Sequence, residues 1–164
     1  MPKVNEIDER ALAQQTTVRE LIRTAMRFEW TAFRFYTDMV GRVRAELHPL
    51  LAELAEEEQN HHDHLQDLLG RDDLVAEFQT SLQAPDTAVR FESLIGDPEL
   101  PAEPSDDDIL EYALAREEAA AAHYGRLADT AGSEALRRAF AYLRDEEISH
   151  VTRLGERWAR LAER

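Results

Sequence analysis

Two eight-residue stretches of the chain share one pattern: Leu54-Ala55-Glu56-Glu57-Glu58-Gln59-Asn60-His61 and Leu143-Arg144-Asp145-Glu146-Glu147-Ile148-Ser149-His150. Each begins with a leucine and ends in Glu-x-x-His, and another leucine follows four residues after the histidine, at Leu65 and Leu154. Residues three or four apart share one face of an α-helix. The pattern therefore predicts two helices that each turn a glutamate and a histidine toward an apolar interior.

Two other segments each place a single glutamate within an apolar stripe. Glu29 lies seven residues before Tyr36, and Glu117 lies seven residues before Tyr124. Apolar residues at helical spacing surround both glutamates. These residues are Val18, Ile22, Ala25, Ala32 and Met39 in the first segment, and Leu110, Ala113, Ala120 and Leu127 in the second. The order of lone glutamate and Glu-x-x-His thus occurs twice, which predicts an internal two-fold repeat.

At two points in the sequence, neighbouring glutamates make it uncertain which of them faces the interior. Glu56 and Glu57 compete with Glu58 for the inward position, and Glu118 competes with Glu117. The repeat favours Glu58, because it is the glutamate that stands three residues before a histidine. The phase of Leu110 and Tyr124 favours Glu117.

Composition limits the class of protein. The 164 residues are 43% hydrophobic and 32% charged, which is typical of a globular chain of one domain, here residues 1–164. The formal net charge of −15 disfavours nucleic acid and anionic lipid as partners. The chain has no cysteine, which excludes disulfides, thiolate zinc sites and a rubredoxin-type centre. The sequence shows neither a membrane span nor a secretory signal, so we expect a cytoplasmic protein.

The helix signals predict an all-α fold with four long helices. Capping residues, prolines and glycines place these helices at about 17–41, 45–69, 105–131 and 133–162. No strand pattern is evident, and residues 1–16 are expected to form a short helix or a loose arm. The crossover linker 70–104 can travel the length of the bundle, which predicts a four-helix bundle with one long crossover between helices 2 and 3. Its apolar residues are expected to pack on the bundle; they are Leu74, Val75, Phe78, Val89, Phe91, Leu94 and Ile95.

Six ionisable groups then fall in mid-core, which is costly unless cations are shared among them. They are Glu29, Glu58, His61, Glu117, Glu147 and His150. Four carboxylates and two imidazoles form the ligand set of a dinuclear metal site in a four-helix bundle. Tyr36 and Tyr124 are expected to donate hydrogen bonds to ligand carboxylates. His62, His64 and His123 fall off the stripe and are expected to be solvated.

On these motifs, over residues 17–162, the chain resembles the ferritin-like superfamily, closest to the rubrerythrin-type di-iron domain, with a ligand pattern similar to that of bacterioferritin. The resemblance implies two Fe ions, with Mn or mixed occupancy as an alternative. It implies that Glu58 and Glu147 bridge the metals, that Glu29 and Glu117 each cap one metal, and that His61 and His150 each supply one nitrogen ligand. It also implies a homodimer.

The resemblance implies oxidation of Fe(II) by O2 or H2O2, as a ferroxidase or a peroxide scavenger that draws on an unidentified electron donor. The alternatives are a subunit of an iron-storage cage, a substrate oxygenase and a bundle whose metals are structural. Rubrerythrins carry one more glutamate on helix 3, which exchanges with a histidine as the iron changes oxidation state. That position is Ala120 here, so the exchange is not expected.

Overall fold

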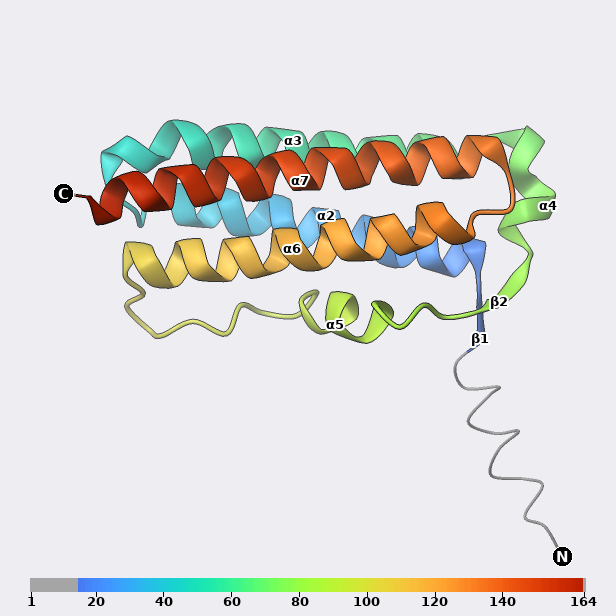
Figure 1. Cartoon of the computed structure of the whole chain (residues 1–164), viewed down its shortest axis with the longest axis horizontal. Coiled ribbons are helices and arrows are strands. Elements are labelled where there is room, and N and C mark those ends of the chain that lie inside the picture. The colour runs from blue at the N-terminus through green and yellow to red at the C-terminus, as the bar shows by residue number, and fades with distance from the viewer. Residues whose placement is uncertain (1–14, 164) are drawn as a thin grey trace, which may run out of the picture.

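Four long helices set the architecture of the protein (Figure 1), which a computed structural model describes over residues 15–163. They are α2 (Val18–Val40), α3 (His48–Leu69), α6 (Asp106–Thr130) and α7 (Glu134–Ala162). α2 and α3 form one antiparallel hairpin, α6 and α7 form a second, and α3 lies beside α7. The predicted all-α four-helix bundle is confirmed.

The capping residues act where the sequence predicts them. Thr17 Oγ1 accepts a hydrogen bond from the backbone N–H of Glu20 at 3.2 Å, and Ser105 and Asp108 cap each other reciprocally at the start of α6. α3 ends just before Gly70 as predicted, but this glycine keeps a right-handed backbone conformation. A Cβ at Gly70 would lie 3.3 Å from the carbonyl oxygen of Asp67, so close approach, rather than a left-handed turn, favours glycine there.

The segment between α3 and α6 crosses the whole length of the bundle. It contains the 3-10 turn Asp72–Leu74, α4 (Val75–Phe78), β2 (Ser81–Gln83) and α5 (Ala88–Ser93), while a further 3-10 turn, Ala45–Leu47, precedes α3. In Figure 1 this segment leaves the right-hand end of α3 and reaches the left-hand end of α6. α3 and α6 therefore run parallel, and the long crossover is confirmed.

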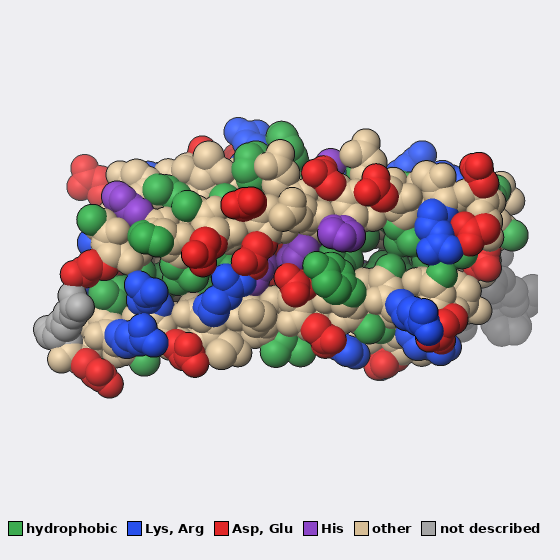
Figure 2. All heavy atoms as spheres, turned by 90° about the horizontal axis from the view of Figure 1, so that it is seen from above, with side chains coloured by type: hydrophobic (Ala, Val, Ile, Leu, Met, Phe, Trp, Pro, Cys, Tyr) green, Lys and Arg blue, Asp and Glu red, His purple; other side chains and the backbone are tan. Residues whose placement is uncertain are grey.

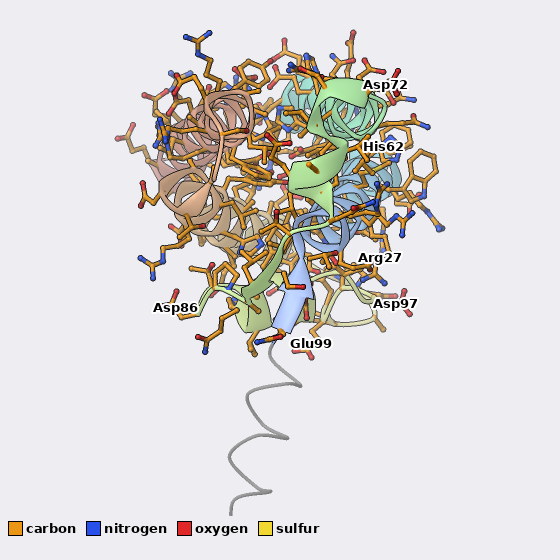
Figure 3. The ribbon with its side chains drawn as sticks, turned by 90° about the vertical axis from the view of Figure 1, so that its right-hand side faces the viewer. Arg27, His62, Asp72, Asp86, Asp97 and Glu99 are labelled. Carbon is orange, nitrogen blue, oxygen red and sulfur yellow. The ribbon has the colours of Figure 1, made fainter. Side chains whose placement is uncertain are left out.

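A short sheet closes one end of the bundle, and the sequence did not predict it. β1 (Gln15–Thr17) pairs antiparallel with β2, with Thr16 opposite Leu82. Figure 3 looks onto this end, where β1 lies beside β2 and α4 lies across the ends of the long helices. Three residues per strand are too few to show an alternating pattern. The expected arm is corrected for residues 15 and 16, which belong to β1; residues 1–14 lie outside the described part.

The apolar core falls into two clusters, one toward each end of the bundle. Ile22, Phe28 and Leu65 belong to the first cluster, and Phe35 and Leu51 belong to the second. Glu29 and its five predicted partners lie between the clusters along the helices and are themselves buried. The long helices therefore enclose a polar layer with apolar packing on both sides.

Aromatic and cationic contacts attach the crossover to the bundle. The Phe91 ring of α5 stacks on Phe28 of α2 at 4.1 Å and on His123 of α6 at 4.2 Å between centroids. The buried guanidinium of Arg116 donates to the carbonyl oxygens of Leu94, at 2.9 Å, and Phe28, at 3.2 Å. One side chain of α6 therefore joins the crossover to α2.

Two expectations about the linker and one about a histidine were wrong. Val75 is 42% exposed and Val89 is 79% exposed, because each lies on the outer face of a short helix. His123 was expected to be solvated but is 1% exposed, with its Nδ1 2.8 Å from Thr87 Oγ1. The crossover covers it, which helical phase within α6 does not reveal.

Burial lowers the pKa of His123 from 6.5 to about 4. The unfolded chain therefore binds this proton more readily than the folded protein, and stability is lost as the pH falls from 6.5 toward 4. Replacing His123 by phenylalanine keeps a ring against Phe91. Between pH 7 and pH 4, the variant should lose about 3 kcal/mol less of its free energy of unfolding than the wild type. Urea unfolding of both proteins at pH 7 and pH 4 measures the difference. Equal acid-dependent losses would contradict the prediction.

Candidate metal centre

The structure brings all six predicted ligand residues together in the polar layer. α2 provides Glu29, α3 provides Glu58 and His61, α6 provides Glu117, and α7 provides Glu147 and His150. None is more than 2% exposed. The alternatives Glu56 and Glu118 are exposed, so the helical phase inferred from the apolar stripes is correct.

The donor atoms of the six residues form two groups that share two glutamates, and a third group joins His61 and His150 to Glu146. Glu29 and His61 make one group with Glu58 and Glu147, and Glu117 and His150 make the other with the same pair. Within each group the donor atoms lie within 4.8 Å of one another. Glu58 and Glu147 are thus the side chains positioned to contact two ions at once.

Each histidine turns its Nδ1 into the carboxylate cluster. His61 Nδ1 lies 2.9 Å from Glu147 Oε1 and 3.0 Å from Glu58 Oε2. His150 Nδ1 lies 3.2 Å from Glu58 Oε1 and 3.3 Å from Glu117 Oε2. The two rings stack with centroids 5.4 Å apart. The Nε2 atoms are left on the far side of the rings.

The tyrosines orient the two lone glutamates across the bundle. Tyr36 of α2 donates a hydrogen bond to Glu117 Oε1 of α6, and Tyr124 of α6 donates one to Glu29 Oε1 of α2. Burial, together with the negative charges of these glutamates, raises the pKa of both phenols well above 10.0. Both phenols therefore keep their protons and remain donors. The two halves of the internal repeat are thus connected by matching hydrogen bonds, because the tyrosine of each half contacts the lone glutamate of the other.

Several buried oxygen and nitrogen atoms of the site make no hydrogen bond, because close approaches such as that of His61 Nδ1 to Glu147 Oε1 lack the required alignment. They are Glu29 Oε2, Glu58 Oε1, both carboxylate oxygens of Glu147 and His61 Nε2. A buried charged oxygen without a partner is costly, and coordination of a cation would satisfy the four oxygens. Carboxylate and imidazole ligands without thiolate suit iron or manganese. The residues therefore fit a dinuclear centre of either metal.

The comparisons with known proteins agree with this donor set. The family model for rubrerythrin matches residues 20–157. The chain belongs to the rubrerythrin family. A search of curated protein sequences found no match.

Two solved structures share the fold of this rubrerythrin-family chain. One is a candidate ferritin-like diiron-carboxylate protein from Thermotoga maritima, with a TM-score of 0.68 and 20% identity, covering 87% of this chain and 95% of that one. The other is a dodecameric thioferritin, a bacterioferritin-related protein from Bacteroides fragilis, with a TM-score of 0.67 and 19% identity, covering 89% of this chain and 86% of that one. Among residues 15–163, no helix combines the length and apolar character needed to cross a membrane.

The surroundings of the cluster raise the pKa of two of its glutamates and lower the pKa of the other two. Burial and the charges of the other glutamates raise the pKa of Glu58 well above 4.5 and that of Glu147 to about 8. Burial also opposes ionisation of Glu29 and Glu117, but hydrogen bonds and the positive charges of the histidines outweigh it and lower their pKa values. Glu58 and Glu147, the two glutamates that both donor groups share, therefore keep their protons more readily than Glu29 and Glu117 do.

Sequence reasoning missed an outer contact of the cluster in this rubrerythrin-family protein. Glu57 accepts a hydrogen bond from His150 Nε2 at 2.7 Å and forms an ion pair with Arg153. The repeat does not reveal this contact, because Glu146, which matches Glu57 in the repeat, makes no hydrogen bond to His61. Figure 2 shows histidine and acidic side chains gathered along the middle of the face that α3 and α7 form.

Metal binding to these residues should release protons. Carboxylate hydrogen bonds and charges raise the pKa of His61 and His150 against the opposing effect of burial, and the pKa values of Glu58 and Glu147 are raised as well, so the metal-free cluster holds its protons more tightly than free side chains would. Metal must displace these protons, so the affinity should rise with pH. Calorimetric titration with Mn(II) in buffers of different ionisation enthalpy measures the proton count. An affinity that does not change between pH 6 and pH 8 would contradict the expectation.

Proposed function

We propose that this protein binds two iron ions between its four long helices and oxidises Fe(II) with O2 or H2O2. The observation that carries the proposal is the sharing of Glu58 and Glu147 by both donor groups. Two ions held by common carboxylates can give up two electrons together. Membership of the rubrerythrin family and the likeness to ferritin-like structures support the same function.

Each residue has a distinct part in the proposed site. Glu58 and Glu147 hold both ions, and their negative charge offsets the positive charge of the metals. Glu29 with His61 holds one ion, and Glu117 with His150 holds the other. Tyr124 and Tyr36 fix the orientation of the lone glutamates through the hydrogen bonds described above. Bound iron supplies the redox chemistry.

The electron balance defines what the reaction needs. Two Fe(II) ions lose one electron each, and the two electrons with two protons convert one H2O2 to two water molecules. With O2 as oxidant, the same electrons and protons yield one H2O2. Repeated turnover on the same ions requires an external electron donor, whereas release of Fe(III) gives a ferroxidase.

Ala120 favours a ferroxidase over a reaction that depends on ligand exchange. It lies on α6 one turn after Glu117 and is fully buried, and its methyl group cannot coordinate metal. No carboxylate at that position is available to replace a histidine when iron changes its oxidation state. We therefore expect the six residues to keep their ligand roles in both oxidation states.

A storage cage is the second candidate, and the dodecameric Bacteroides fragilis structure favours it. The resemblance to the rubrerythrin-type domain favours a homodimer, and a cytoplasmic location belongs to the same proposal. Light scattering distinguishes the assemblies, because their masses would be two or twelve times 18.8 kDa. A particle near the larger mass that retains iron as mineral would replace the dimer and the ferroxidase proposal with storage.

Metal should stabilise the fold, and Glu58→Gln should remove that effect. The substitution keeps the shape of the side chain and replaces a carboxyl group, whose ionisation burial and three other glutamates oppose, by an amide that does not ionise. The metal-free variant should therefore melt at or above the temperature of the metal-free wild type. Fe(II) at about 100 times its Kd should add about 2.7 kcal/mol for each ion that the wild type binds and little to the variant. Anaerobic calorimetry measures both, with the exposed-site variant Glu118→Gln as control.

The same variant tests the reaction. Glu58→Gln weakens a ligand to both ions, so Fe(II) oxidation should slow by at least about 100-fold. Substitutions of residues that only contact a ligand typically cost about 10- to 100-fold, so the loss of a ligand should cost at least as much. Stopped-flow absorbance of Fe(III) and oxygen consumption give the rates, and Glu118→Gln should keep the wild-type rate. Oxidation by Glu58→Gln at the wild-type rate would reject the dinuclear mechanism.

A further inference from the structure

The internal repeat breaks at one position beside the candidate metal centre. The repeat pairs Glu57 of α3 with Glu146 of α7, each directly before a shared glutamate. Three residues after the histidine, however, α7 has Arg153 where α3 has His64. The two halves of the site are therefore symmetric in their inner residues and different in the residues that surround them.

An ionic chain supports the His150 half. Arg153 Nη1 lies 3.2 Å from Glu57 Oε1, and Arg153 Nη2 donates to Glu57 Oε2. That same carboxylate accepts the hydrogen bond from His150 Nε2 at 2.7 Å. Glu53 Oε2 also lies 3.7 Å from Arg153 Nη1. Arg153 and Glu57 are each about 30% exposed, so both are partly shielded from water.

The His61 half lacks this support. His64 packs its ring against Tyr142 at 5.4 Å between centroids, and its Nδ1 lies 2.8 Å from the carbonyl oxygen of Asn60. Glu146 Oε2 is 3.7 Å from His61 Nε2, too far for a hydrogen bond, and its side chain is 36% exposed. Within residues 15–163, no arginine or lysine nitrogen lies within 4.0 Å of the Glu146 carboxylate. His61 Nε2 is buried without a hydrogen bond.

This difference acts on the metal through the imidazole rings. A histidine that binds metal through one nitrogen carries its proton on the other, and an acceptor for that proton fixes the ring and strengthens the ligand. Glu57 is such an acceptor for His150, and Arg153 holds Glu57 in place. His61 has no equivalent, although its Nδ1 enters the cluster in the same way.

We infer that Glu57 and Arg153 are positioning residues that make the two metal positions unequal. The position of Glu117 and His150 fills first and binds more tightly, and the position of Glu29 and His61 fills second and loses its metal first. Glu146, which stands beside His61 without a hydrogen bond to it, gives this second position the looser surroundings. The inference rests on the proposed dinuclear site and adds an order of occupation to it.

Anaerobic titration of the metal-free protein with Co(II) tests the order, because the visible spectrum of Co(II) reports its coordination. Wild type should bind two ions in two resolved steps. Arg153→Gln and Glu57→Gln should weaken the first step by about 10- to 100-fold and leave the second unchanged. Arg153→Lys, which keeps the charge, should restore part of the first step. Glu146→Gln is the matched control and should change either step by less than about 3-fold.

Three further variants assign the steps and test whether the inequality can be reduced. Glu29→Gln should abolish the second step only, and Glu117→Gln the first only. His64→Arg places an arginine at the position that matches Arg153 and should tighten the second step. Thermal unfolding of each metal-free variant checks that the fold is intact.

Different results would contradict the inequality of the two positions and the dinuclear site itself. Two ions bound with equal affinity, or an Arg153→Gln variant that weakens both steps alike, would overturn the inequality and leave the dinuclear site standing. A wild-type protein that binds no Co(II) at the six residues would overturn both.

Discussion

The burial of four carboxylates and two imidazoles in one layer is the constraint on which this structure depends. A layer of this kind has no apolar packing of its own, and the core accordingly divides into a cluster on each side of it. Without metal, the six groups satisfy one another only in part, since oxygens of Glu29, Glu58 and Glu147 remain without hydrogen bonds. Protons held by Glu58 and Glu147 relieve the repulsion in the metal-free protein, and cations would relieve it in the bound state.

The internal two-fold repeat explains how four helices deliver these groups to one place. The helical hairpin α2–α3 carries a lone glutamate and then a Glu-x-x-His pair, and the hairpin α6–α7 repeats the order. Parallel α3 and α6 require a connection as long as the bundle, which the crossover provides (Figure 1). Tyr36 and Tyr124 then connect the hairpins directly to each other's lone glutamate.

The crossover does more than connect the hairpins, because its residues enter the first apolar cluster. Phe91 lies between Phe28 and His123, and Arg116 holds the carbonyl of Leu94. Arg116 directly precedes Glu117 in the chain, so the anchor of the crossover and a residue of the candidate site are neighbours on α6.

The sequence by itself determined the helices, their caps and the six converging residues. Helical periodicity is a local property, and the repeat of Glu-x-x-His with a lone glutamate removed the ambiguity among Glu56, Glu57 and Glu58. Only the tertiary structure decided the rest. The pairing of β1 with β2, the burial of His123 and the contact of Arg153 with Glu57 each join segments far apart in the chain. Local patterns carry no information about such contacts, because the free energy that creates them comes from surfaces that meet only when the helices have packed.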